Sequence, residues 1–144
     1  MLKIAIASDH AGYLYKELVR DYLHGKSIEI IDFGTSSTDS VDYPIFIRPA
    51  AIAVANGNVD YGIIFGGSGN GEAMVANRIQ GIRCAIAWNL LSAEYAKKHN
   101  NANMLSLGQR LIAKDDLFPI VDKWMNSSFE AGRHAKRIDM IDES

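Results

Sequence analysis

The sequence predicts a single α/β domain, a three-layer α/β/α sandwich around a five-stranded, parallel, doubly wound (Rossmann-like) sheet. Short runs of β-branched and apolar residues alternate five times with longer segments whose apolar residues recur at helical spacing. This alternation is typical of parallel sheets covered by helices on both faces. The 144 residues suffice for one continuous core but not for two. No repeat or long linker divides the chain, so the domain is expected to span residues 1–144.

Five strands are expected where short apolar runs are bounded by polar or turn residues. The first run, Ile4–Ala7, stops at Ser8-Asp9, and the third leads directly into a glycine-rich loop. Unusual polar side chains thus follow the first, third and fifth strands, at the edge where open parallel sheets bind ligands. The expected strands span residues 4–7, 28–33, 61–65, 83–87 and 104–107.

Six helices are expected between and after these strands. The first opens at Gly12 and is stopped by Gly25. Pro44 suits the first turn of the second helix, because the N–H that proline lacks would have no partner there. Trp88 and Trp124 are interpreted as packing aromatics. The expected helices span residues 12–25, 44–57, 72–79, 91–99, 114–126 and 132–141.

Composition argues against several partners and compartments. A content of 48% hydrophobic and 22% charged residues is that of an ordinary globular protein, and a net charge of −2 gives no reason to expect a nucleic-acid or membrane partner. The single cysteine, Cys84, suits a reducing compartment and is interpreted as a small buried apolar residue. The apolar run after Lys3 is too short for a signal peptide or a membrane span. A cytoplasmic protein is therefore expected.

The loop Gly66-Gly67-Ser68-Gly69-Asn70-Gly71 carries four glycines between a strand and a helix. Glycine permits positive φ and lets backbone N–H groups approach a ligand closely, and such groups at a helix N-terminus bind anions. The alternative is a tight strand-to-helix turn without a ligand. No Gly-Lys-Ser/Thr of a Walker motif follows, so the loop is not a nucleotide cradle of that kind.

Glu72 directly follows this loop. A carboxylate would repel a bound phosphate, but it suits a loop that stabilises an oxyanion formed when Glu72 removes a proton. That is the chemistry of aldose–ketose isomerisation, in which a base moves a proton between neighbouring carbons while donors hold the enediolate oxygens. The alternative is a first-turn carboxylate that the helix dipole stabilises.

Five motifs occur in order along the chain and together resemble one enzyme family. They are Ser8-Asp9-His10-Ala11-Gly12, Val41-Asp42-Tyr43-Pro44, Gly66 to Glu72 with Ala76-Asn77-Arg78, His99-Asn100-Asn101-Ala102-Asn103 and Gly132-Arg133-His134. Their order and spacing resemble ribose-5-phosphate isomerase type B, in the family it shares with the subunits of galactose-6-phosphate isomerase. The resemblance runs from Ile4 to about Ile138.

The resemblance implies interconversion of ribose 5-phosphate and ribulose 5-phosphate in the pentose phosphate pathway, without a metal or cofactor. It also implies a homodimer or a dimer of dimers, with each site shared between subunits and the C-terminal helix, about 132–142, at the dimer interface. The family has two versions of the base, a cysteine at the position of Gly66 or a glutamate at that of Glu72. This chain matches the glutamate version.

The resemblance also assigns the remaining roles. His99 with Asp9 opens the furanose ring, and Ser68 contacts the sugar or the enediolate. His99 and the basic tail have alternatives, a favourable charge at a helix end and a solvated helix. The residues expected to bind substrate are His10, Tyr43, Gly67, Gly69, Asn70, Gly71, Asn100, Arg110, Arg133, His134 and Arg137.

Two other functions stay open from the sequence. One is isomerisation of a six-carbon substrate such as galactose 6-phosphate or allose 6-phosphate, which would require a deeper pocket. The other is a non-catalytic nucleotide or sugar-phosphate binding module that uses the glycine loop as a plain cradle. Turnover of a sugar phosphate by the purified chain distinguishes the second from both isomerases.

Overall fold

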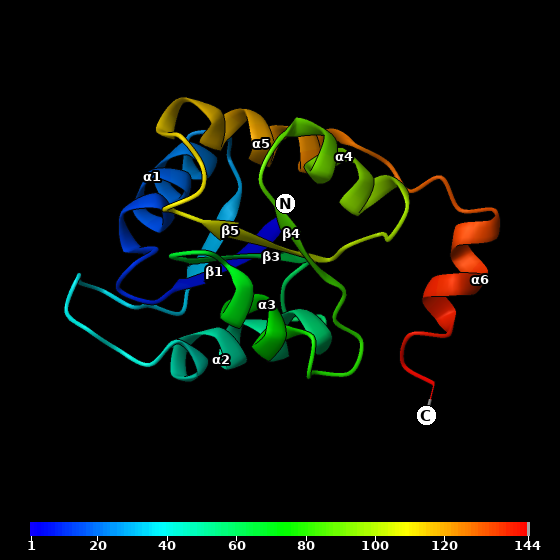
Figure 1. The fold of residues 1–144 in the computed structure, drawn as a ribbon, viewed down its shortest axis with the longest axis horizontal. Helices are drawn as coiled ribbons and strands as arrows, with labels where there is room; N and C mark the ends of the chain where they lie inside the picture. The colour runs from blue at the N-terminus through cyan, green and yellow to red at the C-terminus, as the bar shows by residue number, and fades with distance from the viewer. Residues whose placement is uncertain (144) are drawn as a thin grey trace.

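The computed structural model describes residues 1–143 and shows the expected three layers (Figure 1). Ser144, the last residue of the expected domain, lies outside the described residues. The strands are β1 (Lys3–Ser8), β2 (Glu29–Asp32), β3 (Tyr61–Gly66), β4 (Cys84–Ala87) and β5 (Met104–Gly108). The helices are α1 (Tyr13–His24), α2 (Tyr43–Ala55), α3 (Asn70–Ala76), α4 (Leu90–Lys98), α5 (Lys114–Asn126) and α6 (Arg133–Asp139).

Every expected element is present, and the largest shift in position is that of α3. This helix begins at Asn70 and ends at Ala76, whereas the sequence pattern placed it over 72–79. Its N-cap, Gly69, has φ of 84°, so a left-handed residue turns the chain into the helix earlier than the last glycine suggested. The glycine loop and the first helical turn therefore overlap.

The sheet is fully parallel, with strand order β2-β1-β3-β5-β4. The chain moves outward from β1 to β2 and then crosses to the other side of β1, where β3 lies. Loops that follow β1 and β3 consequently diverge to opposite faces, which opens a crevice at the carboxyl edge of the sheet. The segment after β5, next to β3, borders the same crevice.

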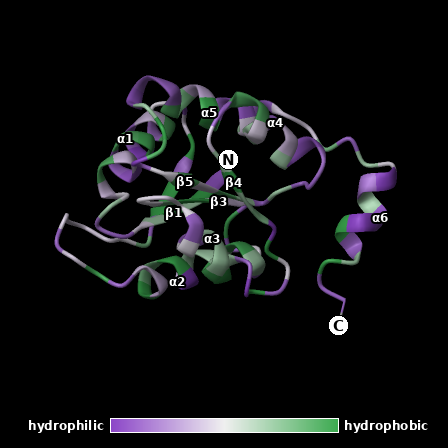
Figure 2. Ribbon diagram, in the orientation of Figure 1, coloured by the Kyte–Doolittle hydropathy of each residue, from purple (hydrophilic) through white to green (hydrophobic). Residues whose placement is uncertain are grey.

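Two hydrophobic cores lie on the two faces of the sheet, and side chains of each strand alternate between them. Ile4 and Ile6 of β1 point into the core beneath α1, α4 and α5, while Ala5 and Ala7 point toward α2 and α3. Figure 2 shows hydrophobic residues concentrated on the strands and on the helix surfaces that face them. Trp124, fully buried on α5, confirms its expected packing role.

The edge strand β4 explains two departures from expectation. Trp88, which follows β4, is 60% exposed, so its interpretation as a packing aromatic is wrong. Cys84 opens the same strand and is half-buried rather than fully buried, although burial raises the pKa of its thiol. An edge strand has no neighbour on one side to cover its side chains, and sequence patterning does not show which strand will be the edge.

The helix α6 stands apart from the rest of the molecule. It contains no buried residue, and Figure 1 shows it projecting from the body on the side opposite the loop of residues 34–42. Much of its surface is hydrophilic (Figure 2). Among residues 1–143, no helix has the length and apolar character required to cross a bilayer.

We predict that Gly12→Ala destabilises the fold and that Gly25→Ala does not. A Cβ at Gly12 would overlap the backbone of Phe65 and Gly66, so the turn after β1 would have to move away from β3. Overpacking of this kind costs about 1–3 kcal/mol. At Gly25 the backbone is helical and the nearest atom to an added Cβ is 3.5 Å away, so alanine should be neutral or stabilising by up to about 1 kcal/mol.

Urea unfolding of the two variants and the unchanged protein measures both effects. Equal stabilities for Gly12→Ala and Gly25→Ala would show that the contact between the β1 and β3 ends does not require glycine.

Candidate active site

The carboxyl ends of β1, β3 and β5 surround a cavity of 280 Å³. The first turns of α2 and α3 complete its wall. Its lining is predominantly polar and combines two carboxylates with an arginine and a histidine, as an acid–base site for an anionic substrate requires. The lining residues are Asp9, His10, Ala11, Tyr43, Gly67, Ser68, Gly71, Glu72 and Arg110.

Asp9 is held rigidly at the end of β1. Its Oδ1 accepts hydrogen bonds from the backbone N–H groups of Ala11 and Gly12, at 2.9 and 3.0 Å. Its own N–H donates to the carbonyl of Phe65 on β3 at 3.3 Å. The side chain is buried, so one carboxylate oxygen closes the turn into α1 and fixes the direction in which the carboxylate faces the cavity.

The glycine loop is anchored to the segment after β5. The carbonyls of Gly66 and Gly67 accept from the N–H groups of Gln109 and Arg110, at 2.8 and 2.9 Å. The hydroxyl of Ser106 donates to the carbonyl of Gly69 at 2.7 Å. These three bonds hold the loop against β5 and the segment that follows it.

Glu72 lies in this first turn and is 4% exposed. Burial raises the pKa of its carboxyl group, and the nearby negative charge of Asp9 raises it further. Hydrogen bonding from the backbone N–H groups of Glu72 and Gly69 opposes the shift without cancelling it. A raised pKa makes the carboxylate a stronger base and brings it closer to the pH at which a cell works.

Glu72 occupies the volume in which a side chain at Gly66 would begin. A Cβ built on Gly66 would overlap the Glu72 carboxylate, both its oxygens and its carboxyl carbon. A side chain at position 66 and the observed position of Glu72 are therefore mutually exclusive. The same point in the cavity can hold a functional group from either residue, but not from both.

Cationic and hydrogen-bonding groups face the carboxylates across the cavity. The exposed Arg110 lies over Gly67, where an added Cβ would be 2.9 Å from Nη1. Nδ1 of His10 accepts a hydrogen bond from the N–H of Val41 at 3.1 Å, so the ring carries its proton on Nε2 and can donate it to an anion. The Tyr43 ring packs against Gly71.

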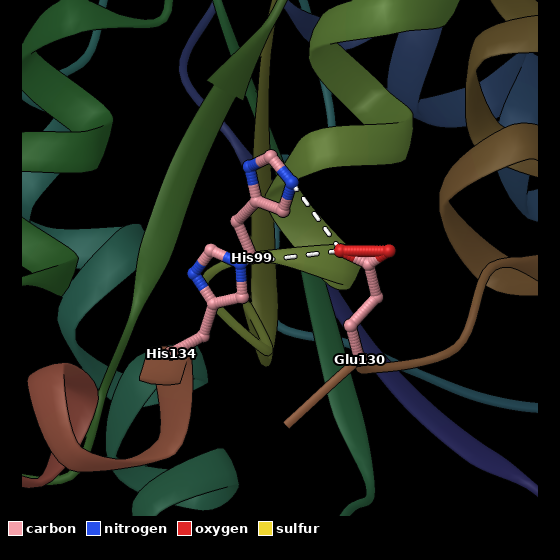
Figure 3. A group of neighbouring side chains, drawn as sticks. All are labelled: His99, Glu130 and His134. Carbon is pink, nitrogen blue, oxygen red and sulfur yellow. Dashed lines mark ion pairs between the residues drawn. The ribbon is translucent and has the colours of Figure 1, made fainter. Parts of the chain in front are cut away.

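A second cluster of expected site residues lies elsewhere in the chain (Figure 3). The rings of His99 and His134 are stacked, with centroids 4.4 Å apart and planes inclined by 14°. Tyr95 stacks on the other face of His99 at 4.5 Å. Both histidines contact Oε1 of Glu130, His99 at 3.4 Å and His134 at 3.9 Å.

The environment of His134 disfavours its protonated form. Partial burial is the main reason that its pKa is lowered, and the positive charges of His99, Arg133 and Arg137 contribute. Glu130 acts in the opposite direction. The exposed Arg133 and Arg137 belong to the same helix, α6, so three cationic or titratable groups are presented together.

The sheet separates the two clusters within one chain. In a parallel sheet, α4 runs back from the carboxyl edge to the amino edge, and His99 is its C-cap. The Arg83 side chain, just before β4, donates to the carbonyls of Asn100 and Asn101 at 3.2 and 3.1 Å, which places these residues at the amino edge too. A strand of five residues spans roughly 15 Å, so His99 cannot reach the cavity beside Glu72 in its own chain.

The expected site residues thus divide into two groups. Those at the cavity or in its glycine loop are Asp9, His10, Tyr43, Gly67, Ser68, Gly69, Asn70, Gly71, Glu72 and Arg110. Those at the opposite end are His99, Asn100, Arg133, His134 and Arg137. Sequence reasoning missed Glu130, although its spacing of four residues from His134 was a signal, because residues so spaced often lie together.

Comparisons with known proteins agree with this architecture over nearly the whole chain. A family model described as Ribose/Galactose Isomerase matches residues 4–141. Ribose-5-phosphate isomerase B of Escherichia coli is 38% identical over 141 residues, which cover 98% of this chain and 95% of the relative.

Two solved structures show the same fold. Ribose-5-phosphate isomerase B of Clostridium thermocellum is 44% identical, with a TM-score of 0.97 over 99% of this chain and 96% of that one. Its counterpart from Thermotoga maritima is 45% identical, with a TM-score of 0.96 over 99% of each chain. The chain therefore belongs to the ribose/galactose isomerase family.

Proposed function

We propose that this protein interconverts ribose 5-phosphate and ribulose 5-phosphate, with Glu72 as the base. The observation that carries the proposal is the buried Glu72 carboxylate, which has a raised pKa and faces a polar cavity beside the glycine loop. The names of the relatives, ribose-5-phosphate isomerase B in several organisms, support the substrate. The proposed setting is the pentose phosphate pathway in the cytoplasm.

In the proposed reaction, Glu72 removes the proton from C2 of the open-chain aldose and returns it to C1. The electrons of the broken C–H bond form the C1=C2 double bond of a cis-enediolate, and a proton passes from the C2 hydroxyl oxygen to O1, so that C2 becomes the carbonyl carbon. Both oxygens need hydrogen-bond donors during this exchange. The Ser68 hydroxyl suits this role, because its oxygen already accepts from the N–H of Asn70 at 3.2 Å and its proton is left to donate. The N–H of Gly71 belongs to the first turn of α3, where N–H groups have no partner inside the helix.

The phosphate requires a fixed cation and hydrogen-bond donors, and the cavity supplies both. Arg110 and the Nε2–H of His10 lie across the cavity from the carboxylates. An arginine fork forms charge-assisted bonds to phosphate oxygens that are roughly twice as strong as neutral hydrogen bonds. The proposed steps use only acid–base and hydrogen-bonding groups of the protein.

We propose that a second copy of the chain completes each site. Its His99, paired with Asp9 of the first copy, would open the furanose ring, and its Asn100, Arg133, His134 and Arg137 would hold the substrate and its phosphate. Two observations support this arrangement. The sheet keeps these residues from Glu72 in one chain, and three of them, Arg133, His134 and Arg137, lie on α6, a helix with no buried residue. A homodimer, or a dimer of dimers, with α6 at the interface follows.

We expect Glu72→Gln to slow the interconversion of ribose 5-phosphate and ribulose 5-phosphate by about 100-fold or more, because an amide cannot accept the proton. Steady-state formation of ribulose 5-phosphate measures the effect. Near-normal turnover would rule out Glu72 as the base.

Stability against pH provides the control for folding in this variant. The pKa of Glu72 is raised in the folded state, so its contribution to stability is present below the unfolded carboxyl pKa and is lost as pH rises through the folded value. At pH 8 the unchanged protein bears the cost of an ionised buried carboxylate, and Glu72→Gln does not. The variant should therefore be at least as stable at pH 8, and this advantage should shrink toward pH 4. An advantage that grows on acidification would mean that the carboxyl pKa is lowered.

We expect Gly66→Ala to reduce turnover at least about 10-fold by displacing the base, since the added methyl group and the Glu72 carboxylate cannot share one volume. The same substitution in a Glu72→Gln background should cause little further loss of turnover, because the effects of substitutions at residues in contact are not additive. If the loss of turnover in the double variant equalled the product of the two single losses, Gly66→Ala would act by a route other than displacing Glu72.

Co-expression of two inactive chains tests the shared site. One chain carries Glu72→Gln and the other His99→Asn, so a mixed dimer contains one intact site and one doubly altered site. Random pairing should restore about a quarter of the unchanged activity for a symmetric dimer. Activity no greater than that of the two variants separately would place both residues in a site within one chain.

A further inference from the structure

Glu130 contacts two expected site residues, His99 and His134, but has no role of its own in the proposed reaction. One of its carboxylate oxygens, Oε1, faces Nε2 of His99 at 3.4 Å and Nε2 of His134 at 3.9 Å. Figure 3 shows the two rings presenting their nitrogen edges to this carboxylate. With Tyr95 on the outer face of His99, the cluster is a stack of three rings, and the Glu130 carboxylate lies at the edge of the two histidines.

Hydrogen bonds fix the backbone of Glu130 beside His99. The N–H of Glu130 donates to the carbonyl of Lys98 at 3.0 Å, which ties it to the residue just before His99. The next two residues, Ala131 and Gly132, both have φ of 59°, and this left-handed turn leads directly into α6. The N–H of His134 then donates to the carbonyl of Ala131 at 3.1 Å. Glu130 is thus fixed to the end of α4 and to the start of α6 at once.

The three groups also have the composition of a metal site, since their ligand atoms lie within 4.8 Å of one another. The orientation of the rings argues against that use. A histidine nitrogen directs its lone pair in the plane of its ring, and these planes are nearly parallel, at 14°. Lone pairs in two stacked planes do not converge on one ion, so the arrangement suits paired imidazoles better than a chelate.

The negative charge of Glu130 affects how closely the two imidazoles can lie. Two imidazoles 4.4 Å apart repel each other when both are protonated, and Arg133 and Arg137 add positive charge on the side of α6. Of the two lysines at this end of α4, Lys98 is paired with Glu94 at 3.2 Å, and Lys97 lies over the rings of Tyr61 and Trp124. The negative charge of Glu130 offsets this repulsion and allows the two rings to stay together.

We propose that Glu130 is a positioning residue, which holds His99 and His134 in register so that one can act on the sugar ring and the other on the phosphate. This inference rests on the proposed function for the roles of the two histidines. The positioning itself does not, because it concerns contacts within the chain. Without the carboxylate, the rings lose their shared counter-charge and separate.

The test compares Glu130→Gln with Glu130→Asp and with Asp139→Asn. The glutamine variant removes the charge with little change in shape, and the aspartate variant keeps the charge on a shorter side chain. Asp139→Asn removes an equal charge from an exposed position on α6, so it controls for a general change in net charge. The full chain is used throughout.

The first readout is the proton NMR signals of the imidazole rings, which stacking shifts away from the positions of free histidine. In Glu130→Gln, the signals of His99 and His134 should move toward those of unstacked rings, while Glu130→Asp should preserve them in part and Asp139→Asn should leave them unchanged. Unmoved ring signals in Glu130→Gln would overturn the proposal, whatever the enzyme does.

The second readout is kcat and KM for ribose 5-phosphate. A misplaced catalytic group commonly costs about 10- to 100-fold, so Glu130→Gln should lower kcat/KM by that amount, with kcat reduced and KM increased, and Glu130→Asp should recover part of the loss. Moved ring signals with kcat/KM within twofold of the unchanged protein would also overturn the proposal. Inactivity of the unchanged protein would count instead against the proposed function, and the ring signals would still test the positioning.

Discussion

The close approach of Glu72 to Gly66 is the contact on which the rest of the site depends. Because position 66 has no side chain, the end of β3 leaves room for a carboxylate from the first turn of α3. That carboxylate is then buried, and burial raises its pKa toward a useful range. One missing side chain therefore determines where the proposed base lies, how it is shielded from water and how strongly it binds a proton.

The surrounding structure maintains this contact from several sides. Bonds from Gln109 and Arg110 hold the glycine loop to the segment after β5, and Asp9 closes the neighbouring turn after β1. Small side chains beneath α2 and α3, such as Ala5 and Ala7, occupy the core on that face of the sheet. The Glu72 carboxylate is thus supported by an edge of three strands, and such support is what the proposed proton transfer needs.

The parallel sheet also separates the candidate site residues of one chain into two groups. Each crossover helix returns the chain to the amino edge, so residues at the C-terminal end of α4 lie far from residues that follow β3. His99 and the cationic residues of α6 form a separate group, organised by stacked rings and by Glu130. In the proposed dimer these two groups are complementary halves of a site, so a symmetric pair of chains would form two complete sites.

Sequence patterning was sufficient for much of this description. The alternation of strands and helices, the glycine loop and the position of Glu72 directly after it are local features, so each element and the residue proposed as the base could be predicted. The burial of Trp124 was also predictable, from the spacing of apolar residues along α5. Features of this kind depend on the period of a helix or strand and on neighbours in the chain.

Tertiary structure alone decided the rest. Which strand forms the edge is a property of strand order, so the exposure of Trp88 could not be foreseen. The overlap between the volumes of Gly66 and Glu72, and the contact of Glu130 with His99 across 31 positions of sequence, depend on packing between distant segments. The sequence by itself determined which chemical groups the protein carries and in which elements. Their distances, their burial and their separation into two groups arose only when the sheet assembled, because those quantities depend on long-range packing.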